Sequence, residues 1–242
     1  MDGEERGRLY VVATPIGNLG DLAPRAAEVL REVDVIAAED TRRTGRLLQS
    51  MGASGAGRML SLFDANESRR TPELVRRMVD EGASVAIVSD AGTPGVSDPG
   101  FVLVRGAIAA DIEVVVVPGP CAVIAALVGS GLPMDRFLFA GFAPRKKGKR
   151  RRWMEELATE RGSIVLYESP VRTARTLDEL AEVFGDDRPA CVAREMTKIH
   201  EEFVRDNLRR LARRYADRQP KGEVVLVVGG ALDRPRVDDE AR

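Results

Sequence analysis

The sequence predicts an α/β fold built from two α/β domains. Short runs of β-branched residues alternate with longer amphipathic stretches through roughly the first 130 residues, a pattern typical of strand–helix units around a mainly parallel sheet. In the second half, two strand candidates follow each other around residues 197–199, which favours a mixed sheet. Residues 129–133, Gly-Ser-Gly-Leu-Pro, break helices between the halves. We therefore expect an N-terminal domain with a parallel sheet over residues 1–129 and a C-terminal domain with a mixed sheet over residues 130–242.

The strands expected in the first half are short apolar runs. They cover Leu9–Ala13, Val33–Ala38, Met59–Phe63, Ser84–Val88 and Glu113–Val117. Asp21 and Pro24 suit the start of a first helix. A second helix is predicted to begin at Thr71 as its N-cap, with Pro72 in its first turn, and to end at Gly82.

The second half contains the same two kinds of segment in a less regular order. Its strand candidates are Arg136–Phe142, Ser163–Tyr167, Ala190–Met196, His200–Arg205 and Glu223–Gly229. Its predicted helices cover residues 150–160, 171–184 and 206–216.

Composition and charge exclude several classes of protein. The 242 residues are 44% hydrophobic and 31% charged, which is ordinary for a globular chain. With 37 Lys and Arg against 38 Asp and Glu, a nucleic acid would have to be bound by a local patch. The apolar runs are far shorter than the roughly 20 residues of a membrane span, and the N-terminus does not resemble a signal peptide, so we expect a cytoplasmic protein without a membrane partner. Cys121 and Cys191 have no CxxC spacing and there is one histidine, so no metal site is expected.

The loops after the strands carry the candidate chemistry. The loop over residues 13–21 contains proline and glycine but neither GxGxxG nor GxxxxGK[ST], which disfavours the common nucleotide folds. The loop Ser89–Gly100 has three glycines, two prolines and two aspartates in twelve residues, and a long glycine-rich loop after a buried strand is a natural ligand platform. Within it, Asp98 before Pro99 has the form of a cap for the next helix, whereas Asp90 has no such role.

These loops and several later motifs, in this order, resemble the tetrapyrrole methylase superfamily. The resemblance runs from about Tyr10 to Gly229. Its motifs are residues 13–21, Ala38-Glu39-Asp40-Thr41-Arg42, Ser89–Gly100, Pro118-Gly119-Pro120-Cys121-Ala122, residues 131–142, Tyr167-Glu168-Ser169-Pro170, Arg194–Glu202 and Lys221-Gly222-Glu223.

The resemblance implies a fold, a reaction and a partner. Members of the superfamily bind S-adenosyl-L-methionine in a cleft between two α/β domains and form homodimers. The motifs are most similar to those of the branch that methylates the 2′-hydroxyl of a cytidine ribose in the 16S rRNA of the small ribosomal subunit. The cofactor-binding positions carried over by the motifs are Pro15, Asp90, Ala91, Gly92, Thr93, Val96, Cys121, Ala122, Tyr167, Glu168, Ala193, Arg194, Gly222 and Glu223. Gly95-Val96 departs from the family pattern, in which a larger aliphatic residue often stands.

Methyl transfer to a ribose hydroxyl also needs a group that accepts the hydroxyl proton. Asp40 and Arg42 follow the second predicted strand and are the candidate catalytic residues, with the acid near the hydroxyl and the arginine on a phosphate. The alternative for this segment is structural, with Asp40 or Thr41 beginning a helix.

The clearest nucleic-acid signal is the segment 145–153, which holds seven basic residues among nine and one aromatic residue, Trp153. The predicted RNA-binding residues are Arg145, Lys146, Lys147, Lys149, Arg150 and Arg151. A solvated loop with Trp153 packed inside is the alternative. At the level of function, the alternatives are a methylase of a small molecule or of a modified amino acid, which would not need this segment, and an RNA-binding factor without catalysis, which would not need the cofactor loops.

Overall fold

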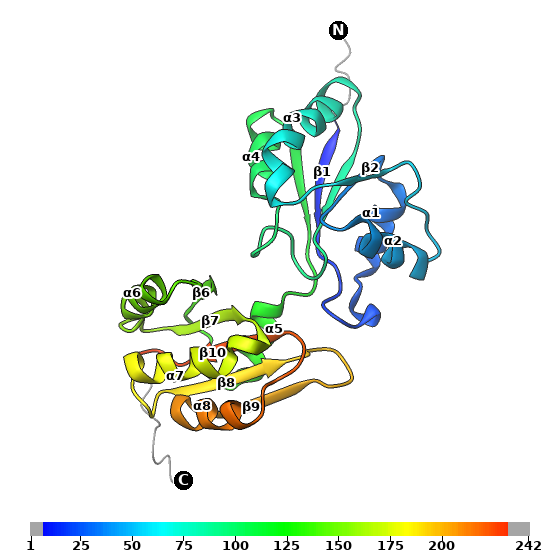
Figure 1. Ribbon diagram of the computed structural model, residues 1–242. Coiled ribbons are helices and arrows are strands. Elements are labelled where there is room, and N and C mark those ends of the chain that lie inside the picture. The colour runs from blue at the N-terminus through cyan, green and yellow to red at the C-terminus, as the bar shows by residue number, and fades with distance from the viewer. Residues whose placement is uncertain (1–6, 232–242) are drawn as a thin grey trace, which may run out of the picture. The chain divides into compact units, whose positions relative to one another are not determined.

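The computed structural model of the protein describes residues 7–231, which form two compact units (Figure 1). Unit 1 ends at Cys121 and unit 2 begins at Ala122. The sequence division at 129/130 differs from this one because of helix α5 (Ala122–Ser130), which packs against strands of the second sheet. No helix within the described range is long and apolar enough to cross a membrane.

Unit 1 contains a parallel five-stranded sheet with helices on both faces. The strand order is β3-β2-β4-β1-β5, and every pair is parallel. The strands are β1 (Arg8–Val12), β2 (Val35–Ala38), β3 (Met59–Ser61), β4 (Val85–Val88) and β5 (Glu113–Val117). The helices are α1 (Pro24–Glu32), α2 (Thr41–Ser50), α3 (Asp64–Asp80) and α4 (Phe101–Ala109), with a 3-10 turn at Leu19–Asp21.

Alternating side chains of β1 serve two separate cores. Leu9 and Val11 pack in one cluster with side chains of α3 and α4, whereas Val12 packs in another with α1 and α2. A strand buried on both faces needs a continuous apolar run, which is why the period-2 polar alternation is missing from these strands. The carboxyl ends of the parallel strands meet at one edge, where the loops of the candidate site begin.

Helix α3 begins earlier than the sequence predicted, so the assignment of Thr71 as its N-cap is wrong. Phe63 precedes the helix, and the Asn66 side chain accepts a hydrogen bond from the Phe63 N–H at 2.9 Å. The Thr71 hydroxyl instead donates to the Glu67 carbonyl at 2.9 Å, and Pro72 lies inside the helix. The cap at Asn66 thus starts the helix before Pro72. Proline usually occurs in the first turn of a helix, which is why the sequence pattern misplaces the start.

Unit 2 contains a mixed five-stranded sheet in the order β6-β7-β10-β8-β9. Strand β6 is parallel to β7, and the other pairs are antiparallel. The strands are β6 (Phe137–Phe142), β7 (Ser163–Glu168), β8 (Pro189–Arg194), β9 (Glu202–Asn207) and β10 (Val224–Val228). The helices are α5, α6 (Lys147–Leu157), α7 (Thr173–Phe184) and α8 (Leu208–Asp217), with a 3-10 turn at Pro170–Arg172.

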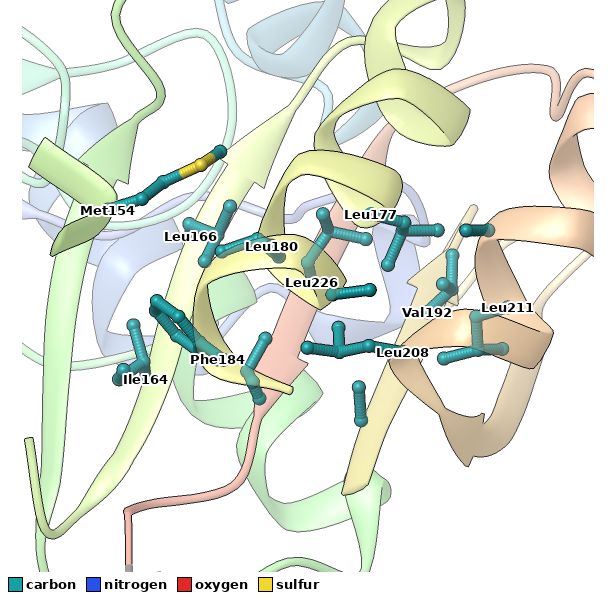
Figure 2. Packing of buried hydrophobic residues seen from close by; sticks show 14 of the residues in the cluster. Met154, Ile164, Leu166, Leu177, Leu180, Phe184, Val192, Leu208, Leu211 and Leu226 are labelled. Atoms are coloured by element: carbon teal, nitrogen blue, oxygen red, sulfur yellow. The ribbon is translucent and has the colours of Figure 1, made fainter. Parts of the chain in front are cut away.

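The core of unit 2 lies between its sheet and helices α7 and α8. Figure 2 shows Leu180 of α7 and Leu211 of α8 directed towards Leu226 and Val192 of the central strands. Each fully buried side chain of this size contributes about 1.5–3 kcal/mol relative to exposure. This packing holds the ends of β7, β8 and β10, which carry the second group of predicted site residues.

Candidate functional site

Main-chain hydrogen bonds join three predicted loops of unit 1. The Thr14 N–H donates to the Gly92 carbonyl at 2.9 Å, and the Gly92 N–H donates to the Thr14 carbonyl at 3.0 Å. The Thr93 hydroxyl donates to the Pro120 carbonyl at 3.1 Å. The loops after β1, β4 and β5 are therefore one connected structure at the carboxyl edge of the sheet, where ligands of open α/β sheets bind.

Gly92 is required at its position by its backbone. Its φ is +89°, which L side chains rarely adopt, and a Cβ there would lie 3.3 Å from the Ile16 side chain. The cofactor positions Ala91, Thr93 and Val96 flank it in the same loop.

A cavity of about 240 Å³ lies beside these loops within unit 1. Two predicted cofactor residues, Pro15 and Asp90, line it, together with Leu19 and Leu47 on its apolar side and Arg43 among its polar groups. The structure thus brings Pro15 and Asp90 together, as expected for residues on neighbouring strand ends.

Two carboxylates beside Asp90 have raised pKa values. The Asp90 N–H donates to Glu39 Oε2 at 3.1 Å, and Asp90 Oδ1 accepts from the Asp40 N–H at 3.0 Å. Burial raises the pKa of Glu39 and outweighs the hydrogen bond from the Asp90 N–H, which lowers it, while the Asp90 charge adds to the increase. Burial, followed by the charge of Glu39, raises the pKa of Asp98 to about 6. Asp98 can therefore exchange a proton near neutral pH, which no sequence pattern had indicated.

Asp98 does not cap the following helix, so that interpretation of its sequence is wrong. The N-cap of α4 is Gly100, with φ +142°, and no side chain of its own segment caps the helix. Buried Glu67 of α3 performs this task, because its Oε1 accepts from the N–H groups of Gly100, Val102 and Leu103 at 2.9, 3.0 and 3.1 Å. A carboxylate at a helix N-terminus also interacts favourably with the helix dipole.

Asp40 is the N-cap of α2, which is the structural alternative that the sequence had left open. Its Oδ1 accepts from the Arg42 N–H at 2.8 Å, and its Oδ2 pairs with the Arg42 guanidinium at 2.7 Å. These hydrogen bonds from Arg42 hold the pKa of Asp40 well below its usual range. The catalytic role of Asp40 and Arg42 stays a prediction, and the low pKa makes Asp40 a weak base.

In unit 2, the sheet register brings six predicted cofactor positions to one end of the sheet. Val224 at the start of β10 pairs with Glu168 at the end of β7 and with Arg194 at the end of β8. The six positions are Tyr167, Glu168, Ala193, Arg194, Gly222 and Glu223. Cys121 and Ala122 stand at the division of the two units.

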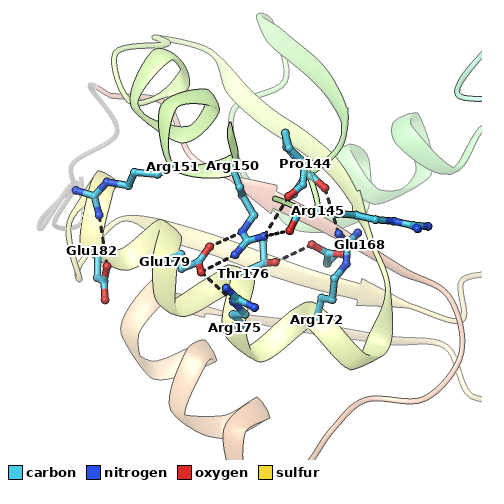
Figure 3. A network of polar contacts seen from close by, with 11 residues as sticks. Pro144, Arg145, Arg150, Arg151, Glu168, Arg172, Arg175, Thr176, Glu179 and Glu182 are labelled. Carbon is cyan, nitrogen blue, oxygen red and sulfur yellow. Dashed lines mark hydrogen bonds and ion pairs between the residues drawn. The ribbon is translucent and has the colours of Figure 1, made fainter. Parts of the chain in front are cut away.

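The Glu168 side chain is committed to a buried network within unit 2 (Figure 3). Its carboxylate is fully buried, pairs with Arg172 at 2.6 Å, and accepts from the Thr176 hydroxyl at 2.7 Å and from the Ser169 N–H at 2.7 Å. In this arrangement a cofactor contact at Glu168 has to come from the backbone.

A second set of ion pairs orders the neighbouring strand ends. The Lys198 ammonium lies 2.9 Å from Glu195 Oε1 and 3.0 Å from Glu223 Oε2. The Glu223 N–H donates to Glu195, and this bond, followed by Lys198, lowers the pKa of Glu195. Gly222 has a φ of +82°, which L side chains rarely adopt, and a Cβ there would lie 2.2 Å from the Glu195 carboxyl group, so a larger residue would be strained and would displace Glu195.

The basic segment divides into exposed residues and one buried arginine. Arg145, Lys146, Lys147 and Lys149 are exposed. Arg151 is also exposed but pairs with Glu155 at 2.7 Å and with Glu182 at 3.4 Å (Figure 3).

Arg150 does not belong with the exposed residues of this segment. Only 3% of it is exposed, and its guanidinium donates to Glu179 at 2.5 and 2.7 Å and to the carbonyls of Pro144 and Arg145 at 3.1 and 2.9 Å (Figure 3). We therefore remove it from the proposed RNA-binding set. Trp153 is partly buried against the core, as in the structural alternative for this segment.

Comparison with known proteins places the chain in a family. A family model described as Tetrapyrrole (Corrin/Porphyrin) Methylases matches residues 8–212. The chain belongs to the tetrapyrrole methylase family. A relative from Synechocystis sp., named ribosomal RNA small subunit methyltransferase I, is 48% identical over 236 residues, which is 97% of this chain and 84% of the relative. A relative of the same name from Mycobacterium tuberculosis is 48% identical over 225 residues, which is 93% of this chain and 78% of the relative.

Solved structures of tetrapyrrole methylases share the fold. Uroporphyrin-III-C-methyltransferase from Thermus thermophilus aligns with a TM-score of 0.64 at 22% identity, covering 94% of this chain and 96% of that one. The methyltransferase CobJ aligns with a TM-score of 0.66 at 20% identity, covering 94% of this chain and 96% of that one. The prediction of an α/β fold of the tetrapyrrole methylase type is confirmed.

The remaining candidate groups do not form a metal centre in the described part of the chain. Among residues 7–231, no group of three or more His, Cys, Asp or Glu side chains is placed to hold a metal ion. Both cysteines are free thiols, and burial raises the pKa of Cys191 to about 11, which makes it a poor nucleophile.

Proposed function

We propose that this protein transfers a methyl group from S-adenosyl-L-methionine to the 2′-hydroxyl of a cytidine ribose in 16S rRNA of the small ribosomal subunit. The observation that carries the proposal is the 48% identity, over 97% of the chain, to a relative named as a small-subunit ribosomal RNA methyltransferase. The exposed residues Arg145, Lys146, Lys147 and Lys149 support an RNA substrate, because they concentrate positive charge in a chain whose formal net charge is −1.

The residues of unit 1 suit the proposed cofactor. Loops of this composition can offer backbone N–H and C=O groups to an adenine edge, and Gly92 lets its loop approach the loops after β1 and β5 closely. Leu19 and Leu47 give the adjacent cavity an apolar side for a thioether region, while the Asp90 carboxylate suits a cationic group. When bound, the cofactor supplies an electrophilic methyl carbon attached to a sulfonium.

In the proposed reaction, the ribose 2′-oxygen forms a bond to the methyl carbon as the carbon–sulfur bond breaks, and the hydroxyl proton is lost to a base. The pKa values separate the two candidate carboxylates. Asp98, with a pKa of about 6, holds a proton far better at neutral pH than Asp40, whose pKa is lowered by Arg42. Asp98, which lies within the electrostatic influence of Glu39 and Asp90 beside the cavity loops, is therefore the better candidate for the base, and Arg42 stays the candidate for positioning a substrate phosphate.

We also propose that the protein acts as a cytoplasmic homodimer, in line with the family resemblance. Sedimentation of the purified chain at micromolar concentration measures its mass directly. A monomer under those conditions contradicts this part of the proposal.

The proposed function is tested with small subunits that lack their methylations and with cofactor labelled in its methyl group. We expect label in 16S rRNA at one nucleotide, located by nuclease mapping. A tetrapyrrole of the uroporphyrinogen type, incubated with the protein and the labelled cofactor in a parallel reaction, should take up no label. Label in the tetrapyrrole instead favours the small-molecule alternative. Thermal stabilisation by the cofactor distinguishes the enzyme from an RNA-binding factor without catalysis, which has no cofactor site.

A further inference from the structure

Unit 2 contains a larger cavity, of about 550 Å³, on the side of its sheet that packs against α7 and α8. Ala190 and Val192 of β8 face the core formed with α8, and Arg194 continues that alternation at the end of the strand. The Arg194 side chain therefore lines the cavity with side chains of α8 and of the segment after it. A cavity of this volume accommodates a nucleotide-sized group.

Four basic side chains and two carboxylates, Glu201 and Glu202, line this cavity, so positive charge is in excess. Glu202 Oε2 pairs with Arg194 at 2.8 Å, and Glu202 Oε1 pairs with Arg214 at 3.2 Å, so one carboxylate serves two guanidinium groups. Arg218 and Lys221 also line the cavity. Within residues 7–231 neither forms a close ion pair, although the charge of Arg218 contributes to lowering the pKa of Glu202. Guanidinium and ammonium groups in such a concave site suit a phosphate.

A second, independent feature of the cavity is the Tyr215 hydroxyl. Tyr215 of α8 is only 5% exposed and lines the cavity, yet its hydroxyl has no hydrogen-bond partner among the described residues. Burial raises the pKa of Tyr215 to about 12, so the hydroxyl stays protonated and can donate. A buried hydroxyl without a partner is costly, and a phosphate that enters with a small shift of the cavity wall can accept a hydrogen bond from it.

We propose that this cavity binds a phosphodiester group of the substrate RNA, with Tyr215, Arg218 and Lys221 as its donors. The inference rests on the proposed function and extends it, because it adds a second RNA contact far along the chain from residues 145–149. Arg194 and Arg214, held by Glu202, add positive charge at the wall of the cavity. Such a contact recognises the RNA backbone and does not distinguish one base sequence from another.

The charged donors are tested by binding of a fluorescent single-stranded oligoribonucleotide of about ten nucleotides, a length within the range of single-strand sites. Arg218→Ala and Lys221→Ala are each expected to weaken binding about threefold to tenfold. Each should also lower the dependence of log K on log salt by about 0.7, the value for one lost phosphate contact on a single strand. Arg213→Ala is the matched control, because Arg213 lies on α8 but does not line this cavity. Equal weakening by all three variants overturns the proposal, since it indicates diffuse attraction.

The hydroxyl is tested by Tyr215→Phe. This change removes only the hydroxyl group, which has no hydrogen-bond partner among residues 7–231. We expect an unchanged or slightly higher Tm and oligonucleotide binding weakened by about threefold to tenfold, as for a lost hydrogen bond to a charged acceptor. Binding equal to that of the unsubstituted protein overturns the role of the hydroxyl. Inorganic phosphate is tested as a competitor. If it binds with the same dependence on Tyr215 while the oligonucleotide does not bind, the site is for a small anion and the RNA assignment is wrong.

Methyl transfer to small subunits separates this inference from the proposed function. We expect Arg218→Ala and Lys221→Ala to raise the KM for small subunits, with a kcat that stays within twofold of that of the unsubstituted protein. If the unsubstituted protein transfers no methyl group to RNA but its oligonucleotide binding depends on Tyr215 and Arg218, the proposed function fails and the cavity remains an RNA-binding site. If transfer occurs and KM is unchanged in both variants, the cavity inference fails alone.

Discussion

The two units hold their candidate site residues by different kinds of interaction. In unit 1, main-chain bonds between Thr14 and Gly92, and a hydroxyl bond from Thr93 to the Pro120 carbonyl, join the loops. In unit 2, side-chain ion pairs of Lys198 with Glu195 and Glu223 reinforce the main-chain bond from the Glu195 N–H to the Glu223 carbonyl at 3.0 Å. Main-chain bonds depend on backbone conformation and therefore on glycine and proline, whereas ion pairs depend on partners that lie apart in the sequence.

This difference has a consequence for the basic segment. Arg150 and Lys149 are neighbours of the same charge, but Arg150 is buried with Glu179 and Lys149 is exposed. Charge density in a sequence therefore indicates a surface for RNA only where no carboxylate of the fold is placed to bury the cation.

The largest expected effect comes from breaking the buried pair of unit 2. Arg150→Met removes the buried partner of the Glu179 carboxylate, which keeps only Arg175 at 2.9 Å, and should lower the free energy of unfolding by about 3 kcal/mol, the lower end for a broken buried pair. Lys149→Met, the exposed control, should change it by less than about 0.5 kcal/mol. Urea unfolding followed by circular dichroism measures both. Equal losses for the two variants would show that the contrast between buried and exposed cations is wrong.

An effect of similar size is expected from the cap of unit 1. Glu67→Ala leaves two buried N–H groups and one partly buried N–H group at the start of α4 without their acceptor and should cost about 2–4 kcal/mol of stability. Glu67→Gln keeps a side-chain oxygen that can accept and should cost less. Thermal and urea unfolding of the pair give the comparison, and an alanine variant as stable as the glutamine variant would contradict the capping role.

Asp98→Asn should stabilise the protein at pH 8, by about 1–3 kcal/mol from a shift of roughly two pKa units. Burial raises the pKa of the folded carboxyl to about 6, above its unfolded value of 3.8, so ionisation destabilises the fold above pH 6. The penalty is lost as the pH falls from 6 to below 3.8, and the variant's advantage should disappear with it. Unfolding at pH 8 and pH 4 checks the sign. The same variant should lower the methyl-transfer rate at pH 7 if Asp98 accepts the proton.

The smallest effect is expected for Asp40→Asn. Asparagine caps a helix as well as aspartate does, and the Arg42 side chain that pairs with Asp40 is 85% exposed. We expect a methyl-transfer rate within twofold of the original and a slightly lower Tm. If the methyl-transfer rate of the folded variant falls a hundredfold or more, Asp40 is the base and Asp98 is not.

The strands were predictable because their signal is local. The run Glu113–Val117 matches β5 at both ends, since valines buried in a parallel sheet leave a continuous apolar pattern. The family motifs were readable for the same reason, because loops such as Ser89–Gly100 are specified by their own glycines and prolines.

The errors came from interactions across the fold. Glu67 caps α4 from 33 to 36 residues away, whereas the local pattern indicates the adjacent Asp98. Glu179 buries Arg150 from 29 residues away, which no local charge pattern reveals. The raised pKa of Asp98 likewise depends on burial and on Glu39 of another strand end.

The central claim is that the methyl group reaches a ribose oxygen of ribosomal RNA. The most direct measurement is digestion of 16S rRNA to nucleosides after incubation of unmethylated small subunits with the protein and methyl-labelled cofactor, followed by mass spectrometry. We expect label in 2′-O-methylcytidine. Label in a base-methylated nucleoside, or none in RNA, would contradict it.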